Sequence, residues 1–432
     1  MEDYQTERRG VRSDFRRDFD RLVFSSPFRR LQNKTQVFPL PGSIFVHNRL
    51  THSLEVASVG RSLASEAALL LAPGYADDPA VLAALDSAEE IVAAACLAHD
   101  LGNPPFGHSG EKAISTFFSE GGGAHLRERV TEAQWADLVH FEGNANAFRL
   151  LTHRFEGRRH GGFAMTYSTL ASIVKYPYSS LLAGGRDKFG FFTSEAETFE
   201  RIADKLGMVR HSAPGEPLRF ARHPLVYIVE AADDICYEVM DLEDAHRLKI
   251  FSTDQVTDLF LAFFDSERQQ RMHRAMARLD DPNEKVAYMR SAVIGCLVKA
   301  CACAFAANET QILAGSFAGR LLDCIPTREK GAYEACNAAS WDKIYRAREV
   351  VDIELAGNRI ITFLLEKLIH AVCHPGENYS RLLLSQVPGQ YQINAPTLFG
   401  KIQAVLDHVS GMTDVYALDL FRKLNGLSLP AV

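Results

Sequence analysis

The strongest constraint on the fold is a helical periodicity of apolar side chains that runs through most of the chain. Between Asn48 and Leu71, apolar residues recur at helical spacing, at Leu50, Leu54, Val56, Val59, Leu63 and Ala67. This spacing places them on one broad face of a long helix. Strand signals are confined to residues 36–40 and 44–47, which favour a small hairpin. The sequence therefore predicts an all-α fold with at most one small β-hairpin.

Further helices are predicted by the same periodicity over 91–98, 142–153, 166–176, 194–206, 225–250, 253–278, 283–307, 340–371, 394–410 and 413–424. Residues 72–87 contain two prolines and a glycine, and predict a loop or a short capped helix. Three consecutive glycines at 121–123 predict a break, and residues 207–224 predict a connector.

The composition is that of an ordinary globular protein, with 432 residues, 47% apolar and 23% charged. No run approaches 18 consecutive apolar residues, so we expect no transmembrane helix. The charged N-terminus lacks the apolar core of a signal peptide. Eight cysteines without a C-x-x-C pair predict reduced thiols in a cytoplasmic protein.

The charge is unevenly distributed. The net charge of −7 argues against a protein dedicated to coating nucleic acid. Residues 1–36 nevertheless contain nine Lys/Arg and six Asp/Glu, a local net charge of +3. A basic segment near an active site would suit a polyphosphate ligand. The alternative is a solvated helix face, and both interpretations stay open.

Residues 96–111 carry the densest set of chemically active side chains, in the order Cys-Leu-Ala-His-Asp-Leu-Gly-Asn-Pro-Pro-Phe-Gly-His-Ser-Gly-Glu. His99 and Asp100 come at the end of an apolar run that predicts a buried helix. A glycine and two prolines then stop that helix. His108 and Glu111 are three residues apart, so they share one face if a new helix begins there. The segment thus predicts two metal ligands, a rigid turn and a His–Glu pair.

Two other segments supply partners for these ligands. His52 lies beside the apolar stripe of the predicted helix over 48–71, and Asp233 lies among apolar residues of the helix over 225–250. A buried carboxylate costs several kcal/mol unless it is paired or binds a metal. Taken singly, a core histidine and a surface carboxylate remain alternatives. Together, His52, His99, Asp100 and Asp233 would form a mixed nitrogen and oxygen site that suits a first-row divalent ion.

Three segments of the chain resemble the bacterial dGTP triphosphohydrolases, a branch of the HD-domain phosphohydrolases. They are Arg-Leu-Thr-His52-Ser-Leu-Glu, His99-Asp100-Leu-Gly-Asn-Pro-Pro-Phe-Gly-His108-Ser-Gly-Glu111 and Glu-Ala-Ala-Asp233-Asp-Ile-Cys-Tyr237. Further matches are Pro27-Phe-Arg-Arg-Leu-Gln, Gln36-Val-Phe, Phe141-Glu-Gly-Asn-Ala-Asn146, Lys175-Tyr-Pro177 and, more weakly, Glu354-Leu-Ala-Gly-Asn-Arg359. The order and spacing of these segments make the resemblance specific.

The resemblance implies a role for each matching residue. The metal ligands would be His52, His99, Asp100 and Asp233. The ion would be Mg²⁺ or Mn²⁺, with Ni²⁺, Co²⁺ and Zn²⁺ as alternatives. His108 matches the catalytic histidine, and Glu111 matches the acid that orients it.

The resemblance also implies a substrate site. Tyr237 would pack against the deoxyribose, while Asp241 and Gln36 would reach its 3′-hydroxyl. Lys175 matches a phosphate-contacting lysine, and Arg49 would lie near the phosphates. Without the resemblance, Tyr237 would be interpreted as a core aromatic residue and Gln36 as a surface amide.

The implied reaction is hydrolysis of a deoxynucleoside triphosphate, dGTP above all, to the deoxynucleoside and tripolyphosphate. A metal-activated water would attack the α-phosphorus, and His108 would act as general acid or as nucleophile. The alternatives are another HD-domain nucleotide phosphohydrolase, either a 5′-nucleotidase or a cyclic-nucleotide phosphodiesterase, and a catalytically silent dNTP-binding regulatory protein.

The resemblance divides the chain into an N-terminal arm and helix over 1–44, an HD-domain catalytic core over 45–250 and a C-terminal helical region over 251–432. The last region would pack on the core and contribute to subunit contacts, since family members are commonly hexamers. A dNTP effector and single-stranded DNA are further partners that the resemblance leaves open. A membrane partner is not expected.

Overall fold

The computed structural model of the chain describes residues 12–38, 46–158 and 161–427. The first half contains the helices α1 (Asp14–Val23), α2 (Ser26–Arg30), α3 (Arg49–Leu71), α4 (Pro79–Ala98), α5 (Gly107–Ser119), α6 (Glu132–Val139), α7 (Gly143–Thr152), α8 (Tyr167–Ser172), α9 (Ala196–Lys205) and α10 (Val226–Arg247).

The second half contains α11 (Thr253–Leu261), α12 (Ser266–Met276), α13 (Pro282–Ala307), α14 (Glu309–Leu313), α15 (Thr327–Lys343), α16 (Arg348–Cys373), α17 (Asn378–Leu384), α18 (Leu398–Ser410) and α19 (Asp414–Leu424). Short 3₁₀ helices lie between them, at η2 (Leu31–Asn33), η3 (Ala72–Tyr75), η4 (Ala124–Arg129), η5 (Ser180–Leu182), η6 (Gly184–Arg186), η7 (Thr193–Glu195) and η8 (Leu321–Asp323).

The predicted all-α fold is confirmed. Within the described ranges, β-pairing is limited to isolated bridges, which join Thr35 to Asn48, Tyr178 to Arg219, Ser179 to Phe191 and Arg210 to Phe220. The expected hairpin falls largely on residues 39–45, outside the described residues. Its described flanks form a bend at 36–38 and the single bridge between Thr35 and Asn48.

Several helix boundaries differ from the predictions because local capping outweighs periodicity. The Asp78 side chain accepts hydrogen bonds from the first turn of α4, so this helix begins at Pro79 inside the predicted loop. Asp265 caps α12 and divides the helix predicted over 253–278. The helix predicted over 340–371 is the end of α15 and most of α16, separated by a turn before Arg348.

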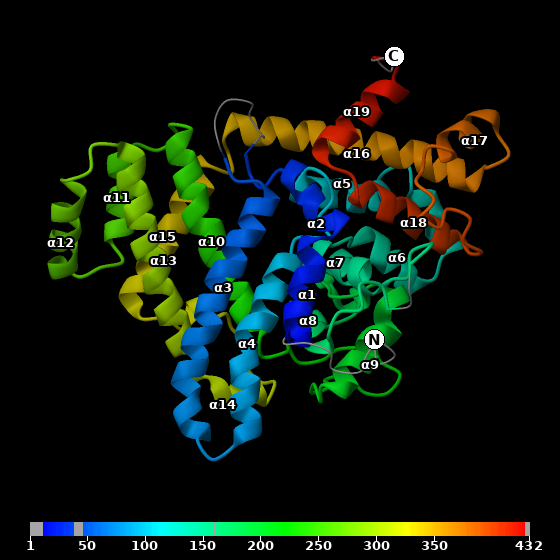
Figure 1. Cartoon of the computed structure of the whole chain (residues 1–432). Helices are drawn as coiled ribbons and strands as arrows, with labels where there is room; N and C mark the ends of the chain where they lie inside the picture. The colour runs from blue at the N-terminus through cyan, green and yellow to red at the C-terminus, as the bar shows by residue number, and fades with distance from the viewer. Residues whose placement is uncertain (1–11, 39–45, 159–160, 428–432) are drawn as a thin grey trace.

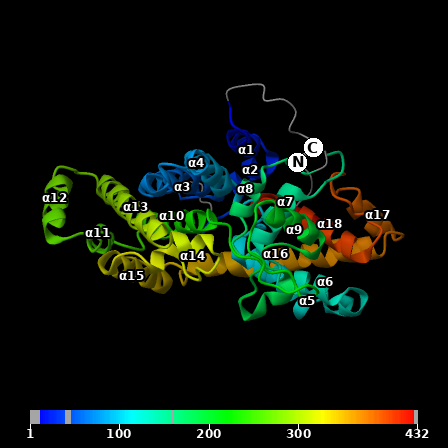
Figure 2. The same ribbon diagram turned by 90° about the horizontal axis from the view of Figure 1, so that it is seen from below.

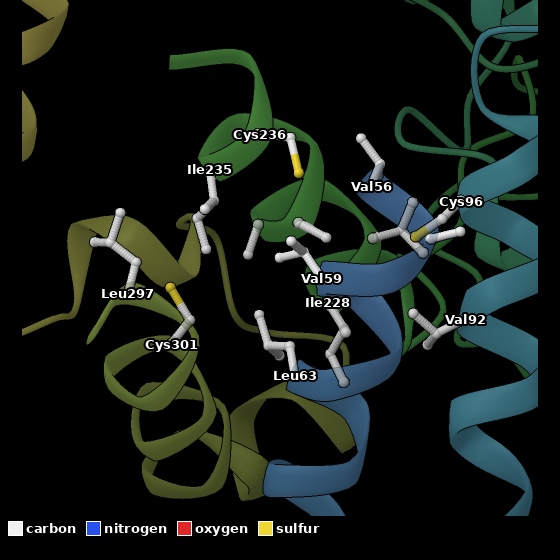
Figure 3. Packing of buried hydrophobic residues seen from close by; sticks show 14 of the residues in the cluster. Val56, Val59, Leu63, Val92, Cys96, Ile228, Ile235, Cys236, Leu297 and Cys301 are labelled. Carbon is white, nitrogen blue, oxygen red and sulfur yellow. The ribbon is translucent and has the colours of Figure 1, made fainter. Parts of the chain in front are cut away.

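Two hydrophobic cores hold the helices together. The first core runs from Leu22 to Val350 and includes α3, α4, α10 and α13. Figure 3 shows Val59 and Leu63 of α3 beside Ile228 of α10, with Leu297 of α13 on one side and Val92 of α4 on the other. The second core joins α5 and α6 to α16, α18 and α19, from Ala113 to Ala417. The chain therefore has two packing centres.

The two cores give the molecule two ends. In Figure 1 the helices α11, α12, α13 and α15 lie on one side of α10, and α5, α6 and α16 to α19 lie on the other. Figure 2 shows the α12 end and the α17 end at opposite extremes in the perpendicular view. The candidate site includes residues from the start of α3, from the segment between α4 and α5 and from α10.

By length and composition, α13 is the one helix among the described residues that could cross a membrane. A buried helix of a soluble protein passes the same test. One face of α13 packs against α3 and α10, with Met289, Val293 and Leu297 fully buried in the first core. Packing into the core accounts for its apolar composition.

Candidate active site

Three helices bring the predicted metal ligands together. A capping box between Asn48 and Thr51 starts α3 and places His52 in its first turns. His99 caps the end of α4, and Asp233 projects from α10. His52 Nε2 and His99 Nε2 lie 3.0 and 3.4 Å from the same atom, Asp233 Oδ1. We call His52, His99, Asp100 and Asp233 the metal cluster.

The geometry of this cluster fits a divalent ion. The potential ligand atoms of His52, His99 and Asp100 all lie within 4.8 Å of one another. His99 Nδ1 lies 2.6 Å from the carbonyl oxygen of Cys96, which fixes the proton on that nitrogen. The opposite nitrogen, Nε2, is buried and makes no well-formed hydrogen bond, with Asp233 Oδ1 at 3.4 Å and Asp100 Oδ1 at 3.6 Å. Such an atom is costly in a folded protein unless it binds something, and a metal ion satisfies it.

The electrostatic environment favours a cation at the cluster. Burial disfavours the charged form of Asp233, but His99 and His52 outweigh it and lower the pKa of Asp233 well below its usual range. Burial also opposes protonation of His99, yet Asp100 and Asp233 raise its pKa to about 9. Two ionised carboxylates therefore face two imidazoles, a donor set typical of first-row divalent metal sites.

Asp100 is held from outside the cluster by two neighbours. Arg49 donates to Asp100 Oδ2 at 2.8 Å, and the Asn103 amide donates to Asp100 Oδ1. Burial alone would raise the pKa of Asp100. The opposite effect of Arg49 and His99 is larger, so the pKa of Asp100 lies below its usual value. Such contacts orient a ligand carboxylate. Arg49, predicted near the phosphates, is thus engaged with a metal ligand and also borders the cavity.

The turn after the metal cluster positions His108 and Glu111. A new helix, α5, begins at Gly107, as the pair's spacing required, and His108 Nδ1 lies 3.1 Å from Glu111 Oε2. The other Glu111 oxygen accepts a hydrogen bond from the backbone N–H of Gly143 at 2.9 Å. A Cβ at Gly143 would lie 2.5 Å from Glu111 Oε1, so only glycine permits this approach.

The His–Glu pair is polarised. The hydrogen bond that His108 donates to Glu111 raises the pKa of His108. Burial opposes ionisation of Glu111, but its contact with His108 lowers its pKa. The His108 side chain is 73% exposed while that of Glu111 is 11% exposed. The pair therefore presents an imidazole with a raised pKa to the cavity, with the Glu111 carboxylate behind it.

These groups line one cavity of about 320 Å³, which we call the active cavity. Gln36, Lys175 and Tyr237, predicted to bind substrate, border it together with the metal cluster and the His–Glu pair. Lys175 Nζ lies 3.1 Å from Glu230 Oε1, and Gln36 Oε1 is buried without a hydrogen-bond partner. The structure thus brings the predicted groups to one space.

Asp241 is the predicted residue that lies apart from the rest. It is buried one helical turn beyond Tyr237 and is absent from the described lining of the active cavity. The Tyr345 hydroxyl donates to Asp241 Oδ2 at 2.8 Å. Burial raises the pKa of Asp241 well above its usual value. The ring of Tyr345 stacks on Tyr237, with centroids 6.1 Å apart and planes at 21°.

Two contributors to the site escaped the sequence analysis. Lys188 lies 3.0 Å from Glu142 and borders the cavity from an irregular segment without a motif. Tyr345 comes from the turn after α15, 104 residues from its partner Asp241. The resemblance assigns no specific role to Glu142 or Asn146, which lie in one of the matching segments. Glu142 caps α7, and Asn146 donates to the carbonyl oxygen of Gly102 at 2.6 Å.

The C-terminal helices complete the turn between His99 and His108. The buried ammonium of Lys34 donates to the carbonyl oxygen of Asn103 and, at 2.8 Å, to that of Ser410 at the end of α18. The carboxylate of Asp414 accepts hydrogen bonds from the backbone N–H groups of Thr35 and Phe106 at 2.8 and 3.0 Å. Residues from both ends of the chain therefore hold the turn between His99 and His108.

Comparison with known proteins agrees with this arrangement. The HD domain family matches residues 49–175, which include three members of the metal cluster and the His–Glu pair. The phosphohydrolase-associated domain family matches residues 328–423, which cover α16 to α18.

Similar proteins extend along nearly the whole chain. A deoxyguanosinetriphosphate triphosphohydrolase-like protein of Pseudomonas aeruginosa is 37% identical over 97% of this chain and 95% of its own length. A protein of the same name from Synechocystis sp. is 35% identical over 99% and 96%. The deoxyguanosinetriphosphate triphosphohydrolase of Yersinia enterocolitica is 32% identical over 95% and 93%. With this extent of similarity and an HD-type cluster of histidines and aspartates, the chain belongs to the deoxyguanosinetriphosphate triphosphohydrolase family of HD-domain hydrolases.

Proposed function

We propose that the protein hydrolyses deoxynucleoside triphosphates, with dGTP as the principal substrate, to the deoxynucleoside and tripolyphosphate. The observation that carries the proposal is the shared cavity. It combines the metal cluster, a His–Glu pair, a lysine and the Tyr237 ring within about 320 Å³. The names of the similar proteins from Pseudomonas aeruginosa and Yersinia enterocolitica support dGTP as substrate.

The metal cluster would hold one divalent ion through His52, His99, Asp100 and Asp233, and we propose Mg²⁺ or Mn²⁺. A bound ion of this kind neutralises charge on phosphoryl oxygens and lowers the pKa of coordinated water. Arg49 and Asn103 would keep Asp100 in its ligating orientation, since both already contact its carboxylate.

His108 is the proposed general acid. Water attacks the α-phosphorus, the bond between phosphorus and the 5′-oxygen breaks, and the 5′-oxygen takes a proton from His108. The exposed imidazole faces the cavity, and Glu111 keeps it charged from behind. General acid catalysis is worth about 10²–10⁴ in rate.

The remaining groups would bind the two ends of the substrate. Lys175 would contact the distal phosphates, since its ammonium borders the cavity and Glu230, against the opposing effect of burial, raises the pKa of Lys175. Tyr237 would contact C2′ of the sugar and exclude ribonucleotides. Gln36, whose amide oxygen lacks a partner, would accept a hydrogen bond from the 3′-hydroxyl, with Asp241 behind Tyr237.

The organisation of the enzyme is part of the same proposal. We retain the division into an arm over 1–44, an HD-domain core over 45–250 and a C-terminal region over 251–432. A homo-oligomer and a cytoplasmic location are proposed as well, the latter because all eight cysteines are free thiols.

The decisive experiment is product analysis. The full chain would be incubated with each of the four dNTPs and with GTP, in the presence of Mg²⁺ or Mn²⁺, and the products separated by ion exchange. The proposal predicts tripolyphosphate and deoxynucleoside as first products, fastest with dGTP. In ¹⁸O-water the label would enter tripolyphosphate and not deoxyguanosine. Orthophosphate or pyrophosphate as first product, or hydrolysis of 5′-monophosphates or cyclic nucleotides alone, would overturn it.

A further inference from the structure

A second and larger cavity lies directly beside the active cavity. Its volume is about 600 Å³, and the two cavities share Lys175 and Tyr176. We call it the outer cavity, and its other described boundaries are the segments 219–222 and 315–318. The mechanism proposed above assigns it no role. Lys175 and Tyr176 therefore border both spaces.

The two cavities differ in charge. The lining of the active cavity includes five carboxylates, from Asp100, Glu111, Glu142, Asp233 and Asp234. The described lining of the outer cavity contains Lys175, His211, Arg219 and Arg222 but no aspartate or glutamate. Glu230, behind the shared boundary, contacts both Lys175 and Arg222, at 3.1 and 2.7 Å. One carboxylate therefore offsets only one of these two cations.

Arg219 supplies the most available positive charge. Its residue is exposed, and among the described residues its guanidinium has no ion-pair or hydrogen-bond partner. Guanidinium groups bind phosphate through paired, charge-assisted hydrogen bonds. A mobile surface arginine would bind weakly, but the backbone that carries Arg219 is held in place.

The frame of the outer cavity is held by backbone hydrogen bonds between separate segments. The N–H of Ser179 donates to Leu218 at 3.0 Å, and the N–H of Phe220 donates to Pro177 at 2.9 Å. On the other side, the N–H of His211 donates to Arg219 at 2.8 Å. The opposite boundary is fixed by the Tyr227 hydroxyl, which donates to the carbonyl oxygen of Phe317 at 2.8 Å. The cavity is thus a built feature of the fold.

We propose that the outer cavity binds the distal part of a linear polyphosphate. The preceding phosphates of the same chain would lie at Lys175 and in the active cavity. This inference rests on the proposed function, which places the terminal phosphate of the substrate at that lysine. The tripolyphosphate product would leave through the outer cavity, because the described lining there offers Arg219 and Arg222 beyond Lys175 and no carboxylate. Longer polyphosphates would occupy both cavities at once.

The test compares inhibition by inorganic tripolyphosphate and by a longer linear polyphosphate of defined length. Initial rates of dGTP hydrolysis would be measured at a constant concentration of free divalent ion, because polyphosphate chelates the metal. The longer chain should inhibit at least about tenfold more tightly, since it adds charge-assisted hydrogen bonds in the outer cavity. Equal inhibition constants for the two chain lengths would overturn the proposal.

Arg219→Ala should abolish the advantage of the longer chain, and Arg219→Lys should restore part of it. Arg274→Ala is the matched control, because Arg274 is an exposed arginine of α12 outside both cavities. This control should keep the full ratio of inhibition constants. Far-ultraviolet circular dichroism would check that each variant is folded. A length advantage that survives in Arg219→Ala would count against the outer cavity.

A binding measurement separates this inference from the proposed function. Isothermal titration of the same polyphosphates into the full chain requires no turnover. If the enzyme releases no tripolyphosphate from any dNTP, the proposed function is wrong, whereas Arg219-dependent binding of the longer chain would still support a polyphosphate site. If tripolyphosphate is released but titration finds no dependence on chain length, the inference fails and the proposed function stands.

Discussion

Helix α10 carries two aspartates on one face, and their environments are opposite. Asp233 contacts two histidines of the metal cluster, and its pKa lies well below the usual range. Asp241, two turns later, accepts a hydrogen bond from Tyr345, and burial holds its pKa well above the usual value. The same type of side chain therefore has a lowered pKa beside the two histidines and a raised pKa where burial dominates.

The contrast teaches that helical spacing sets position while tertiary partners set charge. Residues four and eight apart share a face, so α10 aligns Asp233, Tyr237 and Asp241. His99, at the end of α4, lowers the pKa of Asp233, whereas burial raises the pKa of Asp241 despite the hydrogen bond from Tyr345. A carboxyl group that keeps its proton can donate a hydrogen bond as well as accept one.

The most direct test of the different roles of Asp233 and Asp241 is to remove one carboxylate at a time. Asp233→Asn should lower kcat/KM for dGTP at least about 10⁴-fold, because a metal ion contributes several kcal/mol to phosphoryl transfer and 1.36 kcal/mol is tenfold in rate. Asp241→Asn should keep Mn²⁺ binding and lose activity mainly through a higher KM. Calorimetric titration with Mn²⁺ and steady-state kinetics measure both, and normal Mn²⁺ affinity in Asp233→Asn would refute the assignment.

The next largest effect concerns the proton donor at the metal end. His108→Ala should lower kcat about 10²–10⁴-fold with little change in KM. Glu111 raises the pKa of His108, so Glu111→Gln should lower that pKa. Since the general acid must be protonated, activity of Glu111→Gln should decline at a lower pH than activity of the parent. A pH–rate profile measures this shift, and an unmoved alkaline limb would contradict the role of the pair.

At the sugar end, Tyr237→Ala should relax discrimination against ribonucleotides. The ring borders the active cavity and is supported by Tyr345, so its loss opens space for a 2′-hydroxyl. The ratio of kcat/KM for dGTP to that for GTP should fall at least about tenfold, a change of 1.4 kcal/mol. Tyr237→Phe keeps the ring and serves as the control. The assignment fails if the alanine and phenylalanine variants discriminate equally well.

A smaller effect is expected for Tyr345→Phe, which removes one hydroxyl and leaves the stacked ring. The buried carboxyl of Asp241 then loses its donor, which should cost about 1–3 kcal/mol in the free energy of unfolding. Urea denaturation measures the loss. Tyr75→Phe is the comparison, since the Tyr75 hydroxyl donates to Glu309 at 2.6 Å away from the site. Equal stability of Tyr345→Phe and the parent would show that the hydroxyl contributes nothing.

The smallest effect is a pH dependence of stability. An ordinary aspartate ionises near pH 4, whereas Asp241 retains its proton in the folded protein to a higher pH. The unfolded chain therefore releases this proton first, and the parent should lose stability relative to Asp241→Asn as pH rises above about 4, by at most about 1.4 kcal/mol per pH unit. Urea denaturation from pH 4 to pH 8 measures the difference. Asp258→Asn, at an exposed position, should show no such trend.

Sequence patterns predicted the fold where local signals agreed. The helix over 48–71 was predicted almost to the residue because Asn48 and Thr51 cap it and the apolar stripe is unbroken. The helix α15 was largely missed, since it follows Pro326, contains Gly331 and has no strong amphipathic pattern. Where capping and tertiary packing decided a boundary, as before Pro79, periodicity alone was insufficient.

The same distinction holds for the site. The metal cluster and the His–Glu pair lie in motifs, so the resemblance indicated them, and the structure brings them to one cavity. Lys188 and Tyr345 belong to no motif and reach the site only through tertiary packing. The outer cavity is formed by four separate segments, and its charge became visible only when these were placed side by side. The sequence alone did not show which distant segments lie side by side.

The contacts of Lys34 and Asp414 determine when, during synthesis of the chain, the turn between His99 and His108 can be fully supported. Thr35 and Asp414 are hydrogen-bonded across a sequence separation of 379 residues, and Asp414 also holds Phe106 in the catalytic turn. At about 5–20 residues per second, a ribosome needs roughly 20–80 s to synthesise that interval. During this time the turn between His99 and His108 lacks its C-terminal support. We therefore expect a nascent chain to stay inactive until translation is complete, which would spare the nucleotide pool from unfinished copies.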